Sequence, residues 1–233
     1  MANGTPARPN RASALIALLL LAPVPTIGVT CAMFVMPGPV GRVVFTIAKI
    51  WLVAFPAVWY LAVERGTPSW SPIRRGGLAT GAAVGLFMGG AVVVSYWWII
   101  GHMVDPDAVR RAAVTMELSS PVWFLLAAAG WTLVNSVVEE YVYRWFVLSE
   151  LRVLMADAAA VLGSAAIFTV HHVVAVSFYL DPLPTLLGSV GVFTGGAIWS
   201  WLYLRYGSIW PGWISHALVD VAVFAVGWHL LFG

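Results

Sequence analysis

The chain has 233 residues, of which 61% are hydrophobic and 9% are charged, and its formal net charge is +2. Soluble domains hold about 45–50% apolar and about 25% charged residues, so this composition excludes a soluble globular protein. It indicates instead that a lipid bilayer is the solvent for most of the chain. So small a net charge gives no indication of a nucleic-acid partner, and none is expected.

The apolar segments are long enough for helices of about 20 residues, the length that crosses a ~30 Å hydrocarbon core. Backbone groups in hydrocarbon must bond within their own segment, which favours helices, and the alternation of a membrane barrel is absent. The expected fold is therefore all-α, a polytopic membrane helix bundle of about seven to eight transmembrane helices. The segments lie near residues 12–36, 44–63, 78–101, 121–150, 158–180, 185–205 and 209–231.

The beginning of the chain has two interpretations. We expect residues 1–11 to be a disordered cytoplasmic N terminus and residues 12–233 to form a single transmembrane domain, with the catalytic motifs within 121–231. A cleaved signal peptide is the alternative, because Arg8 and Arg11 precede an apolar run. That run continues to about Met36, which favours a retained span.

The connections predict the orientation and one surface helix. The polar segment 102–121 favours a surface helix between Pro106 and the Ser-Ser-Pro break that ends it. A cytoplasmic N terminus puts more arginines inside than outside, as the positive-inside rule requires. We therefore expect a multi-pass protein of a cell membrane, here a bacterial inner membrane. The inner arginines are Arg8, Arg11, Arg65, Arg74, Arg75, Arg152 and Arg205, and the outer ones are Arg42, Arg110 and Arg111.

Three clusters of polar residues, VVEEYVYR, IFTVHH and ISHALVD, lie inside three different predicted spans. An ionisable side chain at bilayer depth costs about 2.5–3.5 kcal/mol on insertion scales, so such residues usually face a partner or a water-filled cavity. At 1.5 Å per residue, Glu139, His172 and His216 lie ~16, ~22 and ~10 Å from the cytoplasmic ends of their spans. Boundary errors of ~5 Å make these depths overlap, so the clusters are expected at a similar level.

Spacing along the glutamate helix assigns its side chains to faces. Glu140 and Arg144 are four residues apart, which predicts an ion pair on one face. Glu139 points about 100° away and is left free for another task. Asn135 lies one turn earlier and is expected to support Glu139 through a hydrogen bond. In the other clusters, His216 shares a face with the residue four positions later, whereas the two adjacent histidines point in different directions.

The three clusters together resemble the motifs of the CAAX protease and bacteriocin-processing family, also called the ABI family, which includes the type II CAAX prenyl endopeptidases. The order and separation of the motifs fit over roughly residues 121–231. The N-terminal half shows only generic membrane helices. Glu139, Glu140 and Arg144 match E-E-x-x-x-R, Phe168 and His172 match F-x-x-x-H, and His216 and Asp220 match H-x-x-x-(N or D).

The resemblance implies an intramembrane endopeptidase of the glutamate type. Peptide hydrolysis needs a base near a water molecule and donors near the developing negative charge, which these residue types supply. By position, the resemblance makes Glu139 the general base, His172 the holder of the water, Glu140 with Arg144 the orienting pair, and His216 with Asp220 the oxyanion site.

Several residues depart from the motifs or accompany them. Many prenyl endopeptidases carry asparagine where this chain has Asp220, so Asp220 either donates in its protonated form or only orients His216. Trp145 stands where a small residue usually follows the motif arginine, and we expect it to narrow the cavity. Phe168 is expected to shape the pocket and, with Asn135, is assigned to substrate binding.

The remaining polar and aromatic residues have simpler interpretations. His171 is expected to be a neighbour of the site rather than a member. Lys49 either snorkels to the interface or lines the cavity. A group of tryptophans is typical of aromatic belts, and a few of them are open to a role in a substrate groove: Trp97, Trp98, Trp199, Trp201, Trp210 and Trp213.

A metal site is the alternative to a metal-free mechanism. Two histidines with two or three carboxylates are a set that binds Zn²⁺ in other proteins. The sequence has no H-E-x-x-H pair, however, and the resembled family is regarded as working without a catalytic metal. We therefore expect neither a metal nor another cofactor.

The resemblance implies a peptide or protein substrate, and its most familiar substrate is a prenylated, lipid-modified CAAX peptide. A bacterial cell offers few such substrates, which favours maturation of a secreted peptide or a membrane protein. Two other functions stay open. One is a noncatalytic binding or immunity protein of the same fold. The other is a proton-coupled small-solute transporter, for which no inverted repeats are evident.

Overall fold

A computed structural model describes residues 10–67, 71–73 and 76–233, which are helical and contain no strand. Within these residues, seven helical stretches are long and apolar enough to cross a membrane, which confirms the all-α polytopic bundle. Arg8, Arg74 and Arg75 lie outside the described residues. The stretches are Arg11–Val35, Pro39–Val63, Leu78–Met103, Pro121–Leu154, Asp157–Ser177, Pro182–Tyr206 and Trp210–Phe232.

The helices begin where their sequences favour a first turn. Asn10 accepts a hydrogen bond from the backbone N–H of Ser13 at 2.8 Å and caps the first helix, and several others begin with proline, whose missing N–H is not needed there. The elements are α1 (Arg11–Leu21), α2 (Pro23–Thr30), η1 (Cys31–Val35), α3 (Pro39–Val58), η2 (Trp59–Val63), α4 (Leu78–Ser95), η4 (Tyr96–Ile100), η5 (Gly101–Met103), α5 (Pro106–Thr115), α6 (Pro121–Gly130), η6 (Trp131–Asn135), α7 (Ser136–Glu139), η7 (Glu140–Val147), α8 (Leu148–Leu154), α9 (Asp157–Ser177), α10 (Pro182–Tyr206) and α11 (Trp210–Phe232).

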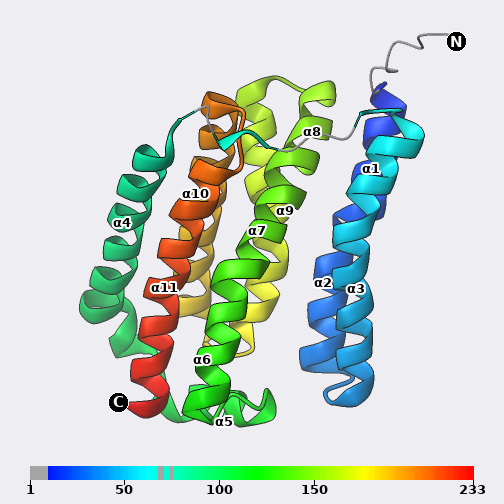
Figure 1. The fold of residues 1–233 in the computed structure, drawn as a ribbon. Coiled ribbons are helices and arrows are strands. Elements are labelled where there is room, and N and C mark those ends of the chain that lie inside the picture. The colour runs from blue at the N-terminus through cyan, green and yellow to red at the C-terminus, as the bar shows by residue number, and fades with distance from the viewer. Residues whose placement is uncertain (1–9, 68–70, 74–75) are drawn as a thin grey trace, which may run out of the picture.

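The spans form two groups that meet at the glutamate helix (Figure 1). The first group is the hairpin of α1, α2 and α3, whose contacts with the rest run through α8, α9 and η7. In the second group α4 packs along α11, and α9 packs along α10. Gly81 and Gly85 permit the α4–α11 approach, because a Cβ at these positions would overlap the backbone of Pro211 and Ser215.

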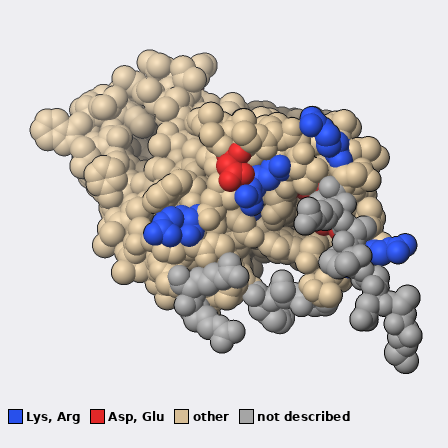
Figure 2. Space-filling view, turned by 90° about the horizontal axis from the view of Figure 1, so that it is seen from above, with Lys and Arg blue, Asp and Glu red and all other residues tan. Residues whose placement is uncertain are grey.

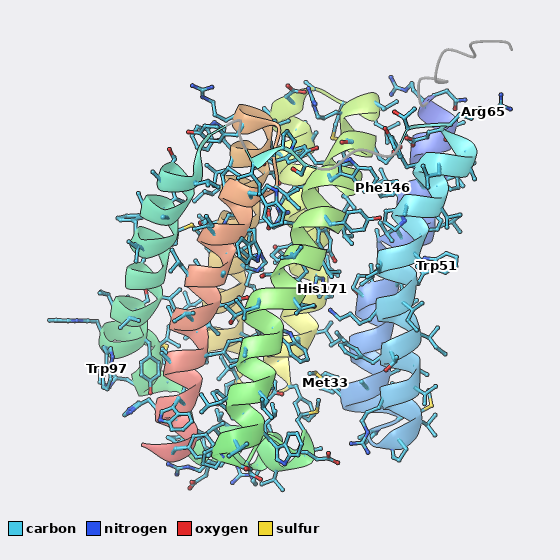
Figure 3. All side chains as sticks on the ribbon, in the orientation of Figure 1. Met33, Trp51, Arg65, Trp97, Phe146 and His171 are labelled. Atoms are coloured by element: carbon cyan, nitrogen blue, oxygen red, sulfur yellow. The ribbon has the colours of Figure 1, made fainter. Side chains whose placement is uncertain are left out.

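The outer surface of the bundle is apolar, as a lipid-facing surface must be. Phe87 and Trp98 are 79% and 78% exposed, far more than large apolar side chains of a soluble core. Figure 3 shows Trp51 and Trp97 projecting away from the bundle on opposite sides. The protein is therefore a multi-pass membrane protein.

The two ends of the bundle carry exposed charged side chains. The end that contains the N terminus presents basic side chains and few acidic ones (Figure 2). At the other end, α5 is the predicted surface helix, capped by Asp105 with the buried residue Val109 against the bundle and Arg110 and Arg111 exposed. A cytoplasmic N terminus remains a prediction from the arginines.

Candidate active site

The glutamate helix changes its hydrogen bonding where the polar residues occur. Within the span Pro121–Leu154, the short α-helical segment α7 ends at Glu139, and η7 then has π-type bonding, in which the Leu148 N–H donates to the Tyr143 carbonyl five residues earlier. Such widened turns are frequent at functional sites. Glu139 and Glu140 therefore lie at the junction between the two bonding patterns, and their carboxylates have different surroundings.

Glu140 is occupied by structural partners. Its Oε1 lies 3.4 Å from Arg144 Nε, and both side chains are fully buried, as the four-residue spacing predicts. Gly212 of α11 leaves room for the other oxygen, since a Cβ there would overlap Glu140 Oε2. The guanidinium of Arg144 lies 4.8 Å from the ring centroid of Phe168, a cation–π distance. This pair fixes the helices around the site, so Glu140 is not free to act on a water molecule.

His216 of α11 connects the two glutamates. Its Nδ1 lies 3.1 Å from Glu140 Oε1, and its Nε2 lies 3.6 Å from Glu139 Oε2. The same Nε2 lies 3.7 Å from Asp220 Oδ1, one turn along the helix. The ring stacks on Trp199 at 3.9 Å between centroids, and the indole N–H of Trp199 donates to Ser215. Three carboxylates thus surround one imidazole, which Trp199 holds in orientation.

Both histidines of α9 lie at the cluster. His171 Nε2 is 3.9 Å from Glu139 Oε1, and its Nδ1 is 3.3 Å from the hydroxyl of Tyr143. His172 Nδ1 donates to the Phe168 carbonyl at 2.8 Å, because a carbonyl only accepts, and this leaves Nε2 as the free nitrogen. Figure 3 shows His171 in the interior of the bundle. His171 is therefore in contact with Glu139, whereas the sequence suggested only a neighbour of the site.

The ring of Phe168 is the centre of this arrangement. It is 1% exposed, and its centroid lies between 4.4 and 6.0 Å from those of His171, His172, His216 and Trp199. The ring therefore packs against all three imidazoles of the site. These contacts favour a role for Phe168 in shaping the pocket over a role in binding substrate directly.

A small cavity adjoins Glu139 on the side of the N-terminal hairpin. It has a volume of about 20 Å³, enough for one water molecule, and Glu139, His171 and Lys49 are among its lining residues. Lys49 Nζ donates to Asn135 Oδ1 at 2.5 Å, so Asn135 holds the lysine rather than Glu139 among the described residues. Of the two interpretations of Lys49, the structure selects the cavity-lining one.

Two aromatic residues lie elsewhere than the sequence suggested. Trp145 is not among the residues that line this cavity; it stacks on Tyr141 at 5.0 Å and contacts Tyr60 at 5.2 Å. The π-type turn directs it toward the N-terminal hairpin. Trp199, assigned to an aromatic belt, is 3% exposed and belongs to the site. Its position inside a glycine-containing span gave no sign of that burial.

A second, open cavity lies on the lipid side between α6–η6 and α11. Its volume is about 540 Å³, and its walls are apolar apart from Thr132. Val221, the neighbour of Asp220, lines it, and Phe124 and Trp228 line it farther along the helices. We call this cavity the lipid-side groove.

One subset of the cluster has the composition of a metal site. Glu139, His171 and His172 each offer a ligand atom within 4.8 Å of the other two. Carboxylate and imidazole are ligands that Zn²⁺ accepts. The sequence missed this set because it assigned only one of the adjacent histidines to the cluster; both turn inward because α9 is covered by η7 on one side and α10 on the other.

The fold and the site define the class of protein. It is a polytopic helical membrane protein with buried carboxylates and imidazoles around a water-sized cavity. Residues 121–222 match the family model described as Type II CAAX prenyl endopeptidase Rce1-like. This segment is thus similar to the Rce1-like domain of the CAAX protease family, and the match confirms the resemblance drawn from the three motifs. No curated protein and no solved structure matches the chain.

Proposed function

We propose that this protein is an intramembrane endopeptidase in which Glu139 activates the water that attacks the scissile peptide bond. The observation that carries the proposal is the division of labour between adjacent glutamates. Glu140 is bound by Arg144 and His216, whereas Glu139 faces imidazoles at 3.6 and 3.9 Å beside a water-sized cavity. A base needs such a position next to a water molecule.

The proposed reaction begins with a water molecule held between Glu139 and His172. Glu139 takes one proton as the water oxygen bonds to the carbonyl carbon, and the carbonyl oxygen becomes an oxyanion. His216, as an imidazolium, donates its Nε2–H to that oxyanion, and Asp220 orients the ring. The proton on Glu139 then passes to the leaving nitrogen as the C–N bond breaks, which regenerates the carboxylate.

The substrate is a peptide or a protein segment, as the family implies. We propose that it enters from the cytoplasmic side, which is the side predicted for the N terminus by the distribution of arginines. The lipid-side groove is apolar and reaches Val221 beside Asp220, so it suits the hydrocarbon tail of a lipid-modified substrate. An unmodified membrane segment would place an apolar side chain there instead.

The test is a cleavage screen with the purified protein in detergent, using prenylated and unmodified peptides, with fragments identified by mass spectrometry. Glu139→Gln and His172→Ala should abolish cleavage while the proteins stay folded. Glu117→Gln and His102→Ala are matched controls, since these residues lie outside the cluster, and should retain cleavage.

The same screen separates the other functions. Peptide binding without cleavage by any preparation would indicate a noncatalytic binding protein. Solute uptake into proteoliposomes without peptidase activity would indicate a transporter. Full cleavage by Glu139→Gln would reject the assigned base even if the protein is a peptidase.

A further inference from the structure

The two α9 histidines are arranged as metal ligands usually are. A metal-binding histidine commonly engages its second ring nitrogen with a carbonyl or another polar group, which fixes the ring. His172 Nδ1 bonds the Phe168 carbonyl at 2.8 Å, and His171 Nδ1 lies 3.3 Å from the Tyr143 hydroxyl. Both rings therefore have Nε2 left over, and His171 directs its Nε2 to Glu139 at 3.9 Å.

The distances within the set are close to those of a coordinated ion. The three ligand atoms lie within 4.8 Å of one another. Zn²⁺ bonds of about 2.0–2.2 Å to nitrogen and oxygen place tetrahedral ligands ~3.3 Å apart. Side-chain rotation that shortens the longest of these separations by about 1.5 Å would therefore close the set around an ion. The adjoining cavity leaves space for a water molecule as a further ligand.

The motif that the chain shares with its family supplies only part of this set. F-x-x-x-H accounts for His172, and the glutamate motif accounts for Glu139. His171 is not one of the two defined positions of that motif, and it turns a carboxylate–imidazole pair into a set of two imidazoles and one carboxylate. Such a set suits first-row divalent metals, zinc in particular.

We propose that Glu139, His171 and His172 bind Zn²⁺, and that bound Zn²⁺ stops peptide hydrolysis. The inhibition rests on the proposed function, because it follows from the loss of Glu139 as a base when its carboxylate becomes a ligand. Glu140 does not replace it, since Arg144 and His216 occupy its accessible oxygen. Binding itself does not depend on whether the protein cleaves peptides.

Binding is measured first, on the full purified chain, by equilibrium dialysis against buffered Zn²⁺ and by the visible absorption of bound Co²⁺. The wild type should bind one ion, and His171→Ala should bind it at least tenfold more weakly. Glu139→Gln should weaken Zn²⁺ binding by the same factor. If the His171 variant does not fold, the Glu139 variant tests the site in its place. The matched control, His102→Ala, lies outside the cluster and should bind like the wild type.

Inhibition is measured next, with a peptide that the wild type cleaves. Zn²⁺ should reduce cleavage by the wild type and by His102→Ala, and His171→Ala should need at least tenfold more Zn²⁺ for the same fractional reduction. Equal Zn²⁺ affinity in wild type and His171→Ala, or Co²⁺ spectra unchanged by Glu139→Gln, would overturn the site. Zn²⁺ binding with the expected variant losses but no peptide cleavage would uphold the site and reject the proposed function instead.

Discussion

The segment 121–222 and the helices before it differ in what their polar residues do. The first contains buried ionisable residues on three helices that converge, whereas the N-terminal spans are mostly apolar and face lipid. A buried charge in a bilayer persists only with a partner or a cavity, so each one points to a site. The family match covers residues 121–222, which contain these three clusters.

Lys49 joins the two regions. It comes from α3, outside the matched segment, and it reaches the cavity beside Glu139 and the amide of Asn135. The hairpin of α1 to α3 therefore closes one wall of the site that the matched segment builds. The ionisable residues of the site are therefore concentrated in the matched segment, whereas the walls around them come from both regions.

The largest expected effect is on stability in the matched segment. Arg144→Met leaves Glu140 fully buried without its cation, and breaking a buried pair in this way costs about 3–5 kcal/mol. Reversible unfolding in mixed micelles measures it. The control is Arg152→Met, whose partner Asp157 is at the surface, and it should cost no more than about 1 kcal/mol. Equal losses in the two variants would show that burial does not distinguish these pairs.

The next effect tests the contact between the regions. Gly85→Val inserts a branched side chain where α4 touches the Ser215 backbone of α11, and overpacking of this kind costs about 1–3 kcal/mol. The measurement is the same unfolding transition, followed by the cleavage rate, because Ser215 precedes His216. An unchanged transition would mean that α4 is not held against α11.

A smaller effect is expected on activity from the N-terminal region. Lys49→Met removes the cation beside Glu139 and frees Asn135, and we expect cleavage to fall about tenfold, equivalent to ~1.4 kcal/mol of barrier. Arg42→Met is the control on the same helix, because Arg42 pairs with Glu117 at the surface. Full activity with Lys49→Met would restrict the chemistry to the matched segment.

The smallest effect belongs to the lipid-facing surface. Leu86 is 65% exposed and follows Gly85 directly, so Leu86→Val should change the unfolding free energy by less than about 0.5 kcal/mol. A loss as large as that of Gly85→Val would mean that this face of α4 is covered by another molecule.

The sequence predicted the spans well because a bilayer imposes length and hydropathy on each one. The seven observed stretches agree with the predicted segments to within a few residues, and the Glu140–Arg144 pair follows from helical spacing. What the sequence did not reveal depends on rotation of helices about their axes. Helical spacing does not give the rotation of one helix relative to its neighbours. That rotation decides which α9 histidine contacts Glu139, which residue bonds Asn135 and which direction Trp145 faces.

The most direct test of the account is the turnover rate of Glu139→Gln relative to wild type, on a peptide that the wild type cleaves, at matched folded fraction. General bases contribute about 10²–10⁴-fold, so the rate constant should fall by that factor while peptide affinity changes little. A rate within threefold of wild type would contradict the claim that this carboxylate activates the water.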